Sequence, residues 1–331
     1  MPQVAGFAEG TVIFERLGVS LPAEDVAQQP LESMLAATLE SGQKPKIEAS
    51  METGDSRREA ARQELQRFWN VSRDYYLLAG EANPHPSAER RDLFDYLEGH
   101  EVVLDLGCGS CENSLWLPDG CHYVGLDVST TGLAMAREWA RPAGLLRADG
   151  IHLPLATGSA DVVISTWVVE HLHDPAKTLL EAARVLRVGG LLMMVCSAWD
   201  LPYSLPPSVA WEQRFAVSVQ RLVGQLRSLL DGRHRFDIVA EPLSLVEGYA
   251  PDTDAVHITQ SFFLCRFLRA AGLRILEHRV LPHETPVSGA RRLWRRLAGR
   301  APIWSHAWGN TLIIARREEC LRRPDYGLRF Y

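Results

Sequence analysis

Short apolar runs alternate with helix-forming segments through the middle of the chain. Runs that predict β-strands lie at 102–106, 122–126, 144–147, 161–166 and 190–196. Helical patterns lie at about 112–117, 130–140, 175–186 and 260–271, and further strands at 273–281 and 310–316. Strands that alternate with helices form a parallel sheet with right-handed crossovers. The pattern therefore predicts an α/β fold.

The residues before this alternation have weaker patterns. Within residues 1–65, a short strand is predicted at Gly10–Phe14, and a helix at Pro30–Leu39 with proline at its first position. Helical patterns follow from Arg57 to Leu78 and near Ala88–Leu97. We expect 1–65 to be an N-terminal extension and 66–100 to be a helical cover in front of the first strand.

Residues 198–258 interrupt the alternation with prolines, aromatic residues and a helix near 209–230. An insertion after the carboxyl end of a strand is a common place for elements that cover a substrate. A second insertion, at 283–308, contains a basic helix, and 318–331 form a tail. The arginines at 291–300 favour a solvated face, with docking of an acidic carrier protein or an anionic substrate as the alternative.

The first predicted strand runs into a glycine-rich turn. Asp105 is followed by glycines at 107 and 109, and the second strand ends in Asp127. Glycines let a ligand approach the backbone closely. An acid at the tip of the second strand is placed to accept hydrogen bonds from both hydroxyls of a ribose. Together these features predict a nucleoside-binding site at the carboxyl ends of the first two strands.

The turn does not fit a dinucleotide. Glu112 stands where the G-x-G-x-x-G/A pattern requires a small residue. Its side chain would prevent close helix–strand packing, and its charge would repel phosphate at the helix N-terminus. The pattern favours a nucleoside ligand without phosphates over NAD or FAD.

Five motifs resemble, in order, those of class I S-adenosyl-L-methionine (SAM)-dependent methyltransferases of the type 11 group. They are VLDLGCGSC at 103–111, YVGLDVS at 123–129, RADGIHLPL at 147–155, ADVVISTWVVEHLHDP at 160–175 and RVLRVGGLLMMV at 184–195. The resemblance runs from about residue 66 to 317 and departs from the family at Cys111, where a third glycine is common. It implies a Rossmann-like domain over 101–317, with a mostly parallel seven-stranded sheet and an antiparallel end strand.

The resemblance also implies the cofactor, SAM, and the residues that hold it. Asp105 is expected to order the glycine loop or reach the methionine amino group, Asp127 to hold the ribose and Asp149 the adenine. An aromatic residue from the helix before the core closes over SAM in similar enzymes. The residues assigned to the cofactor are Asp105, Gly107, Gly109, Asp127, Val128, Asp149, Gly150, Thr166 and Tyr76.

The segment after the fourth strand carries the candidate chemistry, because the methionine end of SAM and the acceptor meet there. Trp167 is assigned beside the sulfonium, since an aromatic face attracts a cation. Glu170 and His171 are candidate general bases, and the alternative for His171 is that it orients the loop. Candidates for the acceptor pocket are Trp199, Tyr203, Trp211 and His257.

Composition agrees with a soluble enzyme. The chain has 331 residues, of which 46% are hydrophobic and 23% charged, and its net charge of −6 favours neither nucleic acid nor an anionic membrane. No apolar run reaches the roughly 20 residues that span a bilayer, and no secretory signal is recognisable. Cys108 and Cys111 form a C-x-x-C within the ligand turn, where small loop residues are favoured over a metal or redox site. We expect a cytoplasmic protein.

The sequence favours a methyltransferase that acts on a small molecule, in specialised metabolism. One alternative keeps SAM as the only substrate: its own amine attacks the γ-carbon, which gives azetidine-2-carboxylate and methylthioadenosine. The other alternative is a non-catalytic protein that binds SAM or a partner. The sequence leaves the acceptor and the oligomeric state open.

Overall fold

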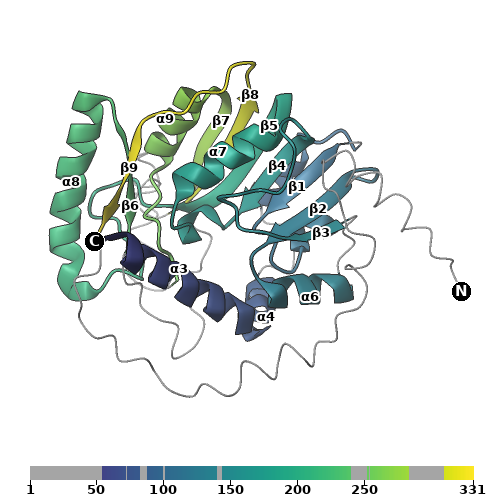
Figure 1. The fold of residues 1–331 in the computed structure, drawn as a ribbon, viewed down its shortest axis with the longest axis horizontal. Helices are drawn as coiled ribbons and strands as arrows, with labels where there is room; N and C mark the ends of the chain where they lie inside the picture. Colours follow the sequence, from purple (N-terminus) through teal and green to yellow (C-terminus); the bar gives the residue numbers. More distant parts are fainter. Residues whose placement is uncertain are drawn as a thin grey trace, which may run out of the picture.

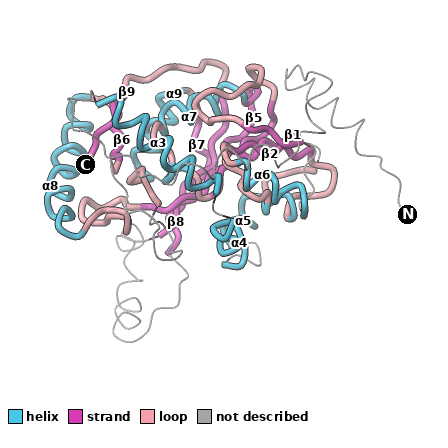
Figure 2. The backbone as a smooth tube through the Cα atoms, turned by 60° about the horizontal axis from the view of Figure 1, so that its bottom comes forward, coloured by secondary structure: helices cyan, strands magenta, loops and turns pink. Residues whose placement is uncertain are grey.

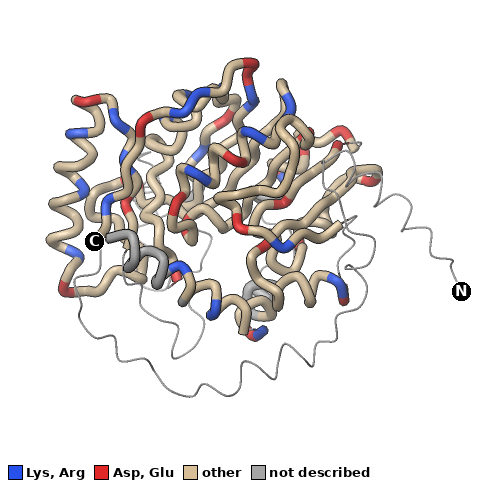
Figure 3. Tube along the Cα trace, in the orientation of Figure 1, with Lys and Arg blue, Asp and Glu red and all other residues tan. Residues whose placement is uncertain are grey.

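The computed structural model describes residues 54–71, 73–82, 88–99, 101–139, 144–239, 252, 254–282 and 309–331. The strand predicted at Gly10–Phe14, the helix at Pro30–Leu39 and the basic insertion 283–308 lie outside these residues. None of the described helices is long and apolar enough to cross a membrane. Acidic and basic residues are interspersed along the described chain (Figure 3).

A seven-stranded sheet forms the centre of the structure, with strand order β3-β2-β1-β4-β5-β8-β7 (Figure 1). Its strands are β1 (Val102–Leu106), β2 (His122–Asp127), β3 (Gly144–Arg147), β4 (Ala160–Thr166), β5 (Leu186–Ala198), β7 (Leu273–Pro282) and β8 (Gly309–Arg317). Strands β1 to β5 pair in parallel, whereas β8 is antiparallel to both β5 and β7. The predicted fold class is confirmed, and the antiparallel strand lies between β5 and β7.

Helices cover both faces of the sheet, so strands such as β1 are buried on both sides. Helices α7 (Pro175–Val185) and α9 (Ser261–Ala271) pack on one face with apolar residues of α3 (Gly54–Val71). Helices α5 (Ala88–Phe94) and α6 (Thr130–Trp139) pack on the other. Figure 2 shows α5 on the opposite side of the sheet from α7 and α9.

Helix boundaries follow local signals in the sequence. The single helical pattern predicted over Arg57–Leu78 is two helices, because α3 ends at Val71 and α4 (Arg73–Ala82) begins two residues later. The helix predicted at 112–117 is a single 3-10 turn at Glu112–Leu115. Asp174 caps α7, as its Oδ1 accepts a hydrogen bond of 3.0 Å from the Lys177 amide.

A second, two-stranded sheet lies beside the main one and was not predicted. Strand β6 (His234–Ile238) of the insertion pairs in parallel with β9 (Tyr326–Phe330) at the C-terminus. Helix α8 (Arg214–Asp231) packs outside β6 and forms the outer edge of this part of the structure (Figure 1). The insertion and the C-terminal residues therefore fold together, although almost 90 residues separate the two strands.

Candidate active site

The glycine loop after β1 has a backbone that only glycine adopts readily. Gly107 and Gly109 have φ angles of 74° and 51°. The amide groups of Gly107 and Cys108 both donate to the Leu126 carbonyl, at 2.7 and 3.0 Å, which fastens the loop to β2. A Cβ on Gly107 would lie 2.5 Å from the Val168 side chain. The loop is therefore closely packed against the segment that follows β4.

Asp127, at the end of β2, organises this loop from the other side. Its Oδ2 accepts a hydrogen bond of 2.8 Å from the Gly109 amide and its Oδ1 one of 2.7 Å from the Ser129 amide. Burial raises the pKa of this carboxyl group. Each carboxylate oxygen keeps a second lone pair, so Asp127 can accept ribose hydroxyls while it holds the loop. The geometry agrees with the role expected from the sequence.

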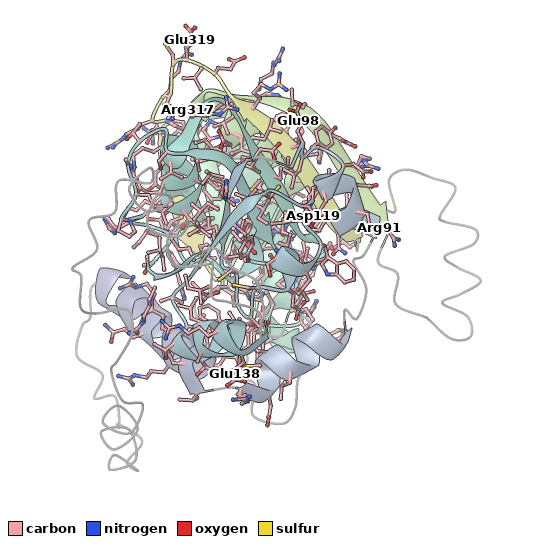
Figure 4. The ribbon with its side chains drawn as sticks, turned by 90° about the vertical axis from the view of Figure 1, so that its right-hand side faces the viewer. Arg91, Glu98, Asp119, Glu138, Arg317 and Glu319 are labelled. Atoms are coloured by element: carbon pink, nitrogen blue, oxygen red, sulfur yellow. The ribbon has the colours of Figure 1, made fainter. Side chains whose placement is uncertain are left out.

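We expect Asp127→Asn to weaken SAM binding by about 1–3 kcal/mol. The amide would turn a donor toward a backbone N–H or a ribose hydroxyl, and the charge assistance would disappear. Isothermal titration of the folded variant measures the change. Asp119→Asn is the matched control, since Asp119, which is labelled in Figure 4, is exposed in the turn before β2. Equal affinity for SAM in the two variants would show that Asp127 does not hold the ribose.

Asp105 is buried beneath the loop and connects three strands. Its Oδ2 accepts hydrogen bonds from the Tyr123 hydroxyl at 2.5 Å and from Asn113 Nδ2 at 3.0 Å. The same Asn113 amide donates to the Thr166 hydroxyl at 2.9 Å. This network joins β1, β2, β4 and the turn after the loop. Of the two roles expected for Asp105, the geometry favours ordering of the glycine loop.

The acid predicted to bind adenine is held by the helical cover. Asp149 forms an ion pair with Arg62 of α3, and its Oδ1 caps the following turn through the Ile151 amide at 3.1 Å. A Cβ on Gly150 would lie 2.9 Å from the Thr178 side chain, so this glycine packs against α7. The Val128 carbonyl accepts a hydrogen bond from the Arg147 side chain. Roles for Asp149, Gly150 and Val128 in adenine or ribose binding remain predictions.

Two aromatic residues flank the loop. Tyr76 of α4 is buried, and a Cβ on Gly109 would lie 3.3 Å from its ring. Trp167 has a left-handed backbone, with φ 54°, and its ring packs on the apolar cluster beneath α5 and α6. Such a conformation is rare for a bulky residue and is often found at functional sites. Its place beside the sulfonium remains a prediction, as does closure of Tyr76 over SAM.

Glu170, the first candidate base, is fully buried after β4. Its Oε1 accepts a hydrogen bond of 3.1 Å from the Ser197 amide, and its Oε2 has no hydrogen-bond partner among the described residues. Burial raises the pKa of this carboxyl group to about 7. Glu170 is therefore poised to gain or lose a proton near neutral pH, as an acid–base residue requires.

We expect Glu170 to make the stability of the fold depend on pH. Its pKa rises from 4.5 in the unfolded chain to about 7 in the folded protein. The folded state then binds one more proton than the unfolded state between these values, so this contribution is present below pH 4.5 and is lost as the pH rises to about 7. Its size is on the order of 3 kcal/mol.

The test is urea unfolding of the wild type and of Glu170→Gln at pH 5 and pH 8. The variant carries a neutral group of the same shape at both pH values. The difference in free energy of unfolding, variant minus wild type, should therefore be larger at pH 8 than at pH 5. A difference between the two proteins that does not change with pH would contradict the shifted pKa.

His171, the second candidate base, is paired with an acid from the insertion. Its Nδ1 is hydrogen-bonded to the main-chain carbonyl of Asp254 at 3.3 Å and also lies 3.3 Å from Asp254 Oδ2, and its ring meets the ring of Trp69 edge-on. Burial lowers the pKa of this imidazole, but the nearby carboxyl groups of Asp254, Glu170 and Asp252 outweigh it and raise the pKa overall. A main-chain carbonyl that accepts the proton of one ring nitrogen fixes the orientation and tautomer of the imidazole.

Asp252 and Asp254 were not among the site residues predicted from the sequence. Asp254 is almost fully buried, and Asp252 Oδ1 accepts a hydrogen bond of 2.9 Å from the Ser197 hydroxyl. The two acids alternate in the run Pro251-Asp252-Thr253-Asp254, which was the available signal. They approach His171 only because the insertion folds back on the ends of β4 and β5. The insertion thus contributes side chains to the candidate site.

The four residues expected in an acceptor pocket differ widely in burial. His257 is buried, with Nδ1 3.0 Å from the Val169 carbonyl, and burial lowers its pKa to about 4, so it is neutral. Trp199 belongs to the apolar core of the insertion. Tyr203 is half exposed and Trp211 is 83% exposed. The prediction for Trp211 is wrong, because so exposed a residue does not line a pocket.

The groups at this site fit SAM. The sulfonium and ammonium groups of SAM are positively charged, and the carboxyl groups of Glu170, after β4, and of Asp252 and Asp254, from the insertion, lie near His171. Asp127 faces the glycine loop with lone pairs suited to ribose hydroxyls. The buried Glu170 Oε2, which lacks a partner among the described residues, is an acceptor for such a ligand.

Comparison with known proteins shows what the chain is similar to. Residues 104–194 match the family described as "Methyltransferase domain". Methyltransferase GfsG of Streptomyces halstedii is 36% identical over 123 residues, which are 34% of this chain and 43% of that protein. Human thiol S-methyltransferase TMT1B is 31% identical over 129 residues, 35% of this chain and 53% of that protein. A solved geranyl diphosphate methyltransferase, bound to GPP and sinefungin, is 15% identical, with 78% of this chain and 99% of that chain covered and a TM-score of 0.49.

Residues 104–194 thus carry a methyltransferase domain within a mostly parallel seven-stranded sheet, and SAM is the cofactor of this domain. The chain spans about half the length of the two curated relatives, 43% and 53%. The resemblance, the fold class and the cofactor expected from the sequence are confirmed.

Proposed function

We propose that this protein is a methyltransferase that moves the methyl group of SAM to an oxygen, nitrogen or carbon atom of a small molecule, in specialised metabolism. The observation that carries the proposal is the pairing of His171 with Asp254 at the end of β4, inside a SAM-dependent domain. When bound, SAM supplies a methyl group already activated by the sulfonium. The protein must then align the acceptor, take up its proton and exclude water.

His171 is the proposed proton acceptor. The main-chain carbonyl of Asp254 accepts the Nδ1 proton, which leaves Nε2 to accept the proton of the acceptor group. General base catalysis of this kind contributes about 10²–10⁴-fold. Glu170 places a second titratable carboxyl group beside the imidazole, and its charge favours the protonated ring that forms.

Enclosure of the site supports a small substrate over a polymer. Helix α3 reaches the strand ends through Arg62 and through the Trp69 carbonyl, which accepts a hydrogen bond of 2.9 Å from the Ser129 hydroxyl. The insertion closes the other side with Asp254. Exclusion of water and alignment of the reactants account for much of the rate in such a reaction.

The described cysteine thiols are free, which supports a cytoplasmic location.

Product analysis tests the proposal. The protein is incubated with SAM alone and with SAM plus a panel of phenols, amines and carboxylic acids, and the products are identified by mass spectrometry. Methyl transfer gives S-adenosylhomocysteine and a methylated product only when an acceptor is present. Methylthioadenosine from SAM alone would instead establish cyclisation, and SAM binding without any turnover would indicate a binding protein.

A variant pair tests the base. His171→Gln should bind SAM with unchanged affinity and lose at least tenfold in turnover. The exposed His152→Gln is the matched control and should keep full turnover. Unchanged turnover in both variants would assign His171 to ordering of the loop.

A further inference from the structure

Helix α8 turns its apolar side away from the protein. The positions that it buries are Val217, Arg221, Gly224 and Ser228, of which only one is a large apolar residue. Eight large apolar residues of α8 and the preceding turn are instead between 41% and 87% exposed: Trp211, Phe215, Val219, Leu222, Val223, Leu226, Leu229 and Leu230. A soluble protein rarely exposes so many contiguous apolar side chains without a partner.

The exposed residues form a regular stripe. Phe215, Val219, Leu222, Leu226 and Leu229 follow one another at steps of four and three residues. This is the a/d spacing with which one helix packs along another. We call these five residues the α8 stripe. Its length, about four turns of helix, is enough for a continuous helix–helix contact.

The helix cannot rotate to bury the α8 stripe. Arg221, on the inner face, is fully buried and donates to the carbonyls of Trp199 at 2.6 Å and Ser204 at 2.5 Å. A Cβ on Gly224 would overlap the guanidinium of Arg329, so the inner face is closely packed against the C-terminal strand. The outward orientation of the stripe is therefore a fixed feature of the fold.

We propose that the α8 stripe binds the α8 stripe of a second copy of this chain, with the two helices antiparallel about a two-fold axis. A two-fold contact pairs the same surface on both subunits and is the commonest arrangement of protein dimers. The exposed parts of the eight side chains amount to roughly 800 Å², which is about the area that each partner buries in a standard interface. The surface thus matches what a stable dimer needs.

Charge agrees with this occupant. Glu212 lies just before α8 and Arg233 just after it, both exposed, and Arg233 also forms an exposed ion pair of 3.1 Å with Asp325 of its own chain. An antiparallel pair brings each Glu212 toward the end of the partner helix where Arg233 lies. The net charge of −6 opposes binding to an anionic membrane, which is the other common use of an apolar helix face.

Sedimentation velocity of the full chain tests the proposal. The wild type should sediment at twice the 37.0 kDa mass of one chain. The double variant Leu222→Glu/Leu226→Glu should sediment as a monomer with an unchanged circular dichroism spectrum. Val188→Glu is the matched control, because Val188 is a similarly exposed apolar residue in β5, and it should stay dimeric. A wild type that is monomeric at every concentration would overturn the proposal. A monomer that co-sediments with anionic vesicles would overturn it too.

Oxidative crosslinking tests the orientation. The Cys320→Ser variant is the background, since Cys320 is an exposed cysteine. In this background Leu222→Cys places one thiol at the middle of the α8 stripe, next to its copy across the two-fold axis, and should give a covalent dimer. Trp211→Cys places the thiols at opposite ends and should not. Equal crosslinking of the two variants would contradict the antiparallel arrangement.

Discussion

Replacing Gly107 by valine is expected to abolish SAM binding while the chain still folds. The first reason is the backbone, since a φ of 74° costs a residue with a side chain about 1–2 kcal/mol. The second is space, because the new Cβ would lie 2.5 and 2.6 Å from the two methyl groups of Val168. Either the loop or the segment after β4 must then move, and the loop carries the amide that Asp127 holds.

Isothermal titration with SAM measures this effect, and we expect affinity to fall at least about a hundredfold, or 2.7 kcal/mol. Gly158→Val is the matched control. Gly158 has nearly the same φ, 73°, but a Cβ there has no neighbour closer than 3.8 Å. The control should lose some stability and keep its SAM affinity. Normal SAM binding by Gly107→Val would show that the loop does not form the cofactor site.

A second change, in the segment after β4, separates the effect of backbone strain from the effect of the steric clash. Val168→Ala removes the methyl groups that meet the new side chain, so adding it to Gly107→Ala should restore part of the lost SAM affinity. Backbone strain alone would leave the double variant as weak as the single one. The comparison therefore measures how much of the loop geometry depends on contact with the segment after β4.

The local pattern was sufficient to predict the main sheet and the position of the loop. Strands β1 and β4 are continuous apolar runs because both of their faces are buried, and such runs are visible in the sequence itself. The turn at Gly107 and the acid at Asp127 follow from those strand ends. Each of these features depends on neighbouring residues, so a sequence window contains the whole signal.

The rest depends on contacts between distant residues, and no window contains those. Strand β9 pairs with β6 across more than 85 residues, and its five residues carry too short a pattern to predict a strand. Asp254 meets His171 from 83 residues away, and Arg62 meets Asp149 from 87. The contact of Asp254 with His171, and that of the helical cover with Asp149, could therefore be recognised only in the folded structure.

The exposure of the apolar side of α8 also depends on a contact between distant residues. Its helical period was recognisable, but an amphipathic pattern does not say which face the fold buries. The buried Arg221 decides the matter, because its ion pair with Asp237 of β6 fixes the orientation of the helix. Trp211 consequently lies outside, and not in the acceptor pocket to which its aromatic character had assigned it.

Replacing Arg221 by methionine is expected to destabilise the insertion strongly. The guanidinium is fully buried and donates to main-chain carbonyls of the segment from Trp199 to Ser204 and to Asp237 Oδ2, the last at 3.4 Å. Methionine fills much of the volume but leaves those oxygens without donors. Removal of one partner from a buried ion pair typically costs about 3–5 kcal/mol.

Urea unfolding at a fixed protein concentration measures the loss, and Arg227→Met, an exposed arginine of the same helix, is the matched control. We expect the control to stay close to the wild type. Asp237 keeps Arg329 and the Tyr331 hydroxyl, the latter at 3.0 Å, so β6 and β9 stay joined to each other. The loss of Arg221 detaches them from α8, so the two strands should open together before the main sheet unfolds. Hydrogen exchange would then show early loss of protection in β6 and β9. If Arg227→Met and Arg221→Met were equally stable, Arg221 would not hold α8 in place, and the fixed orientation of the α8 stripe would lose its physical basis.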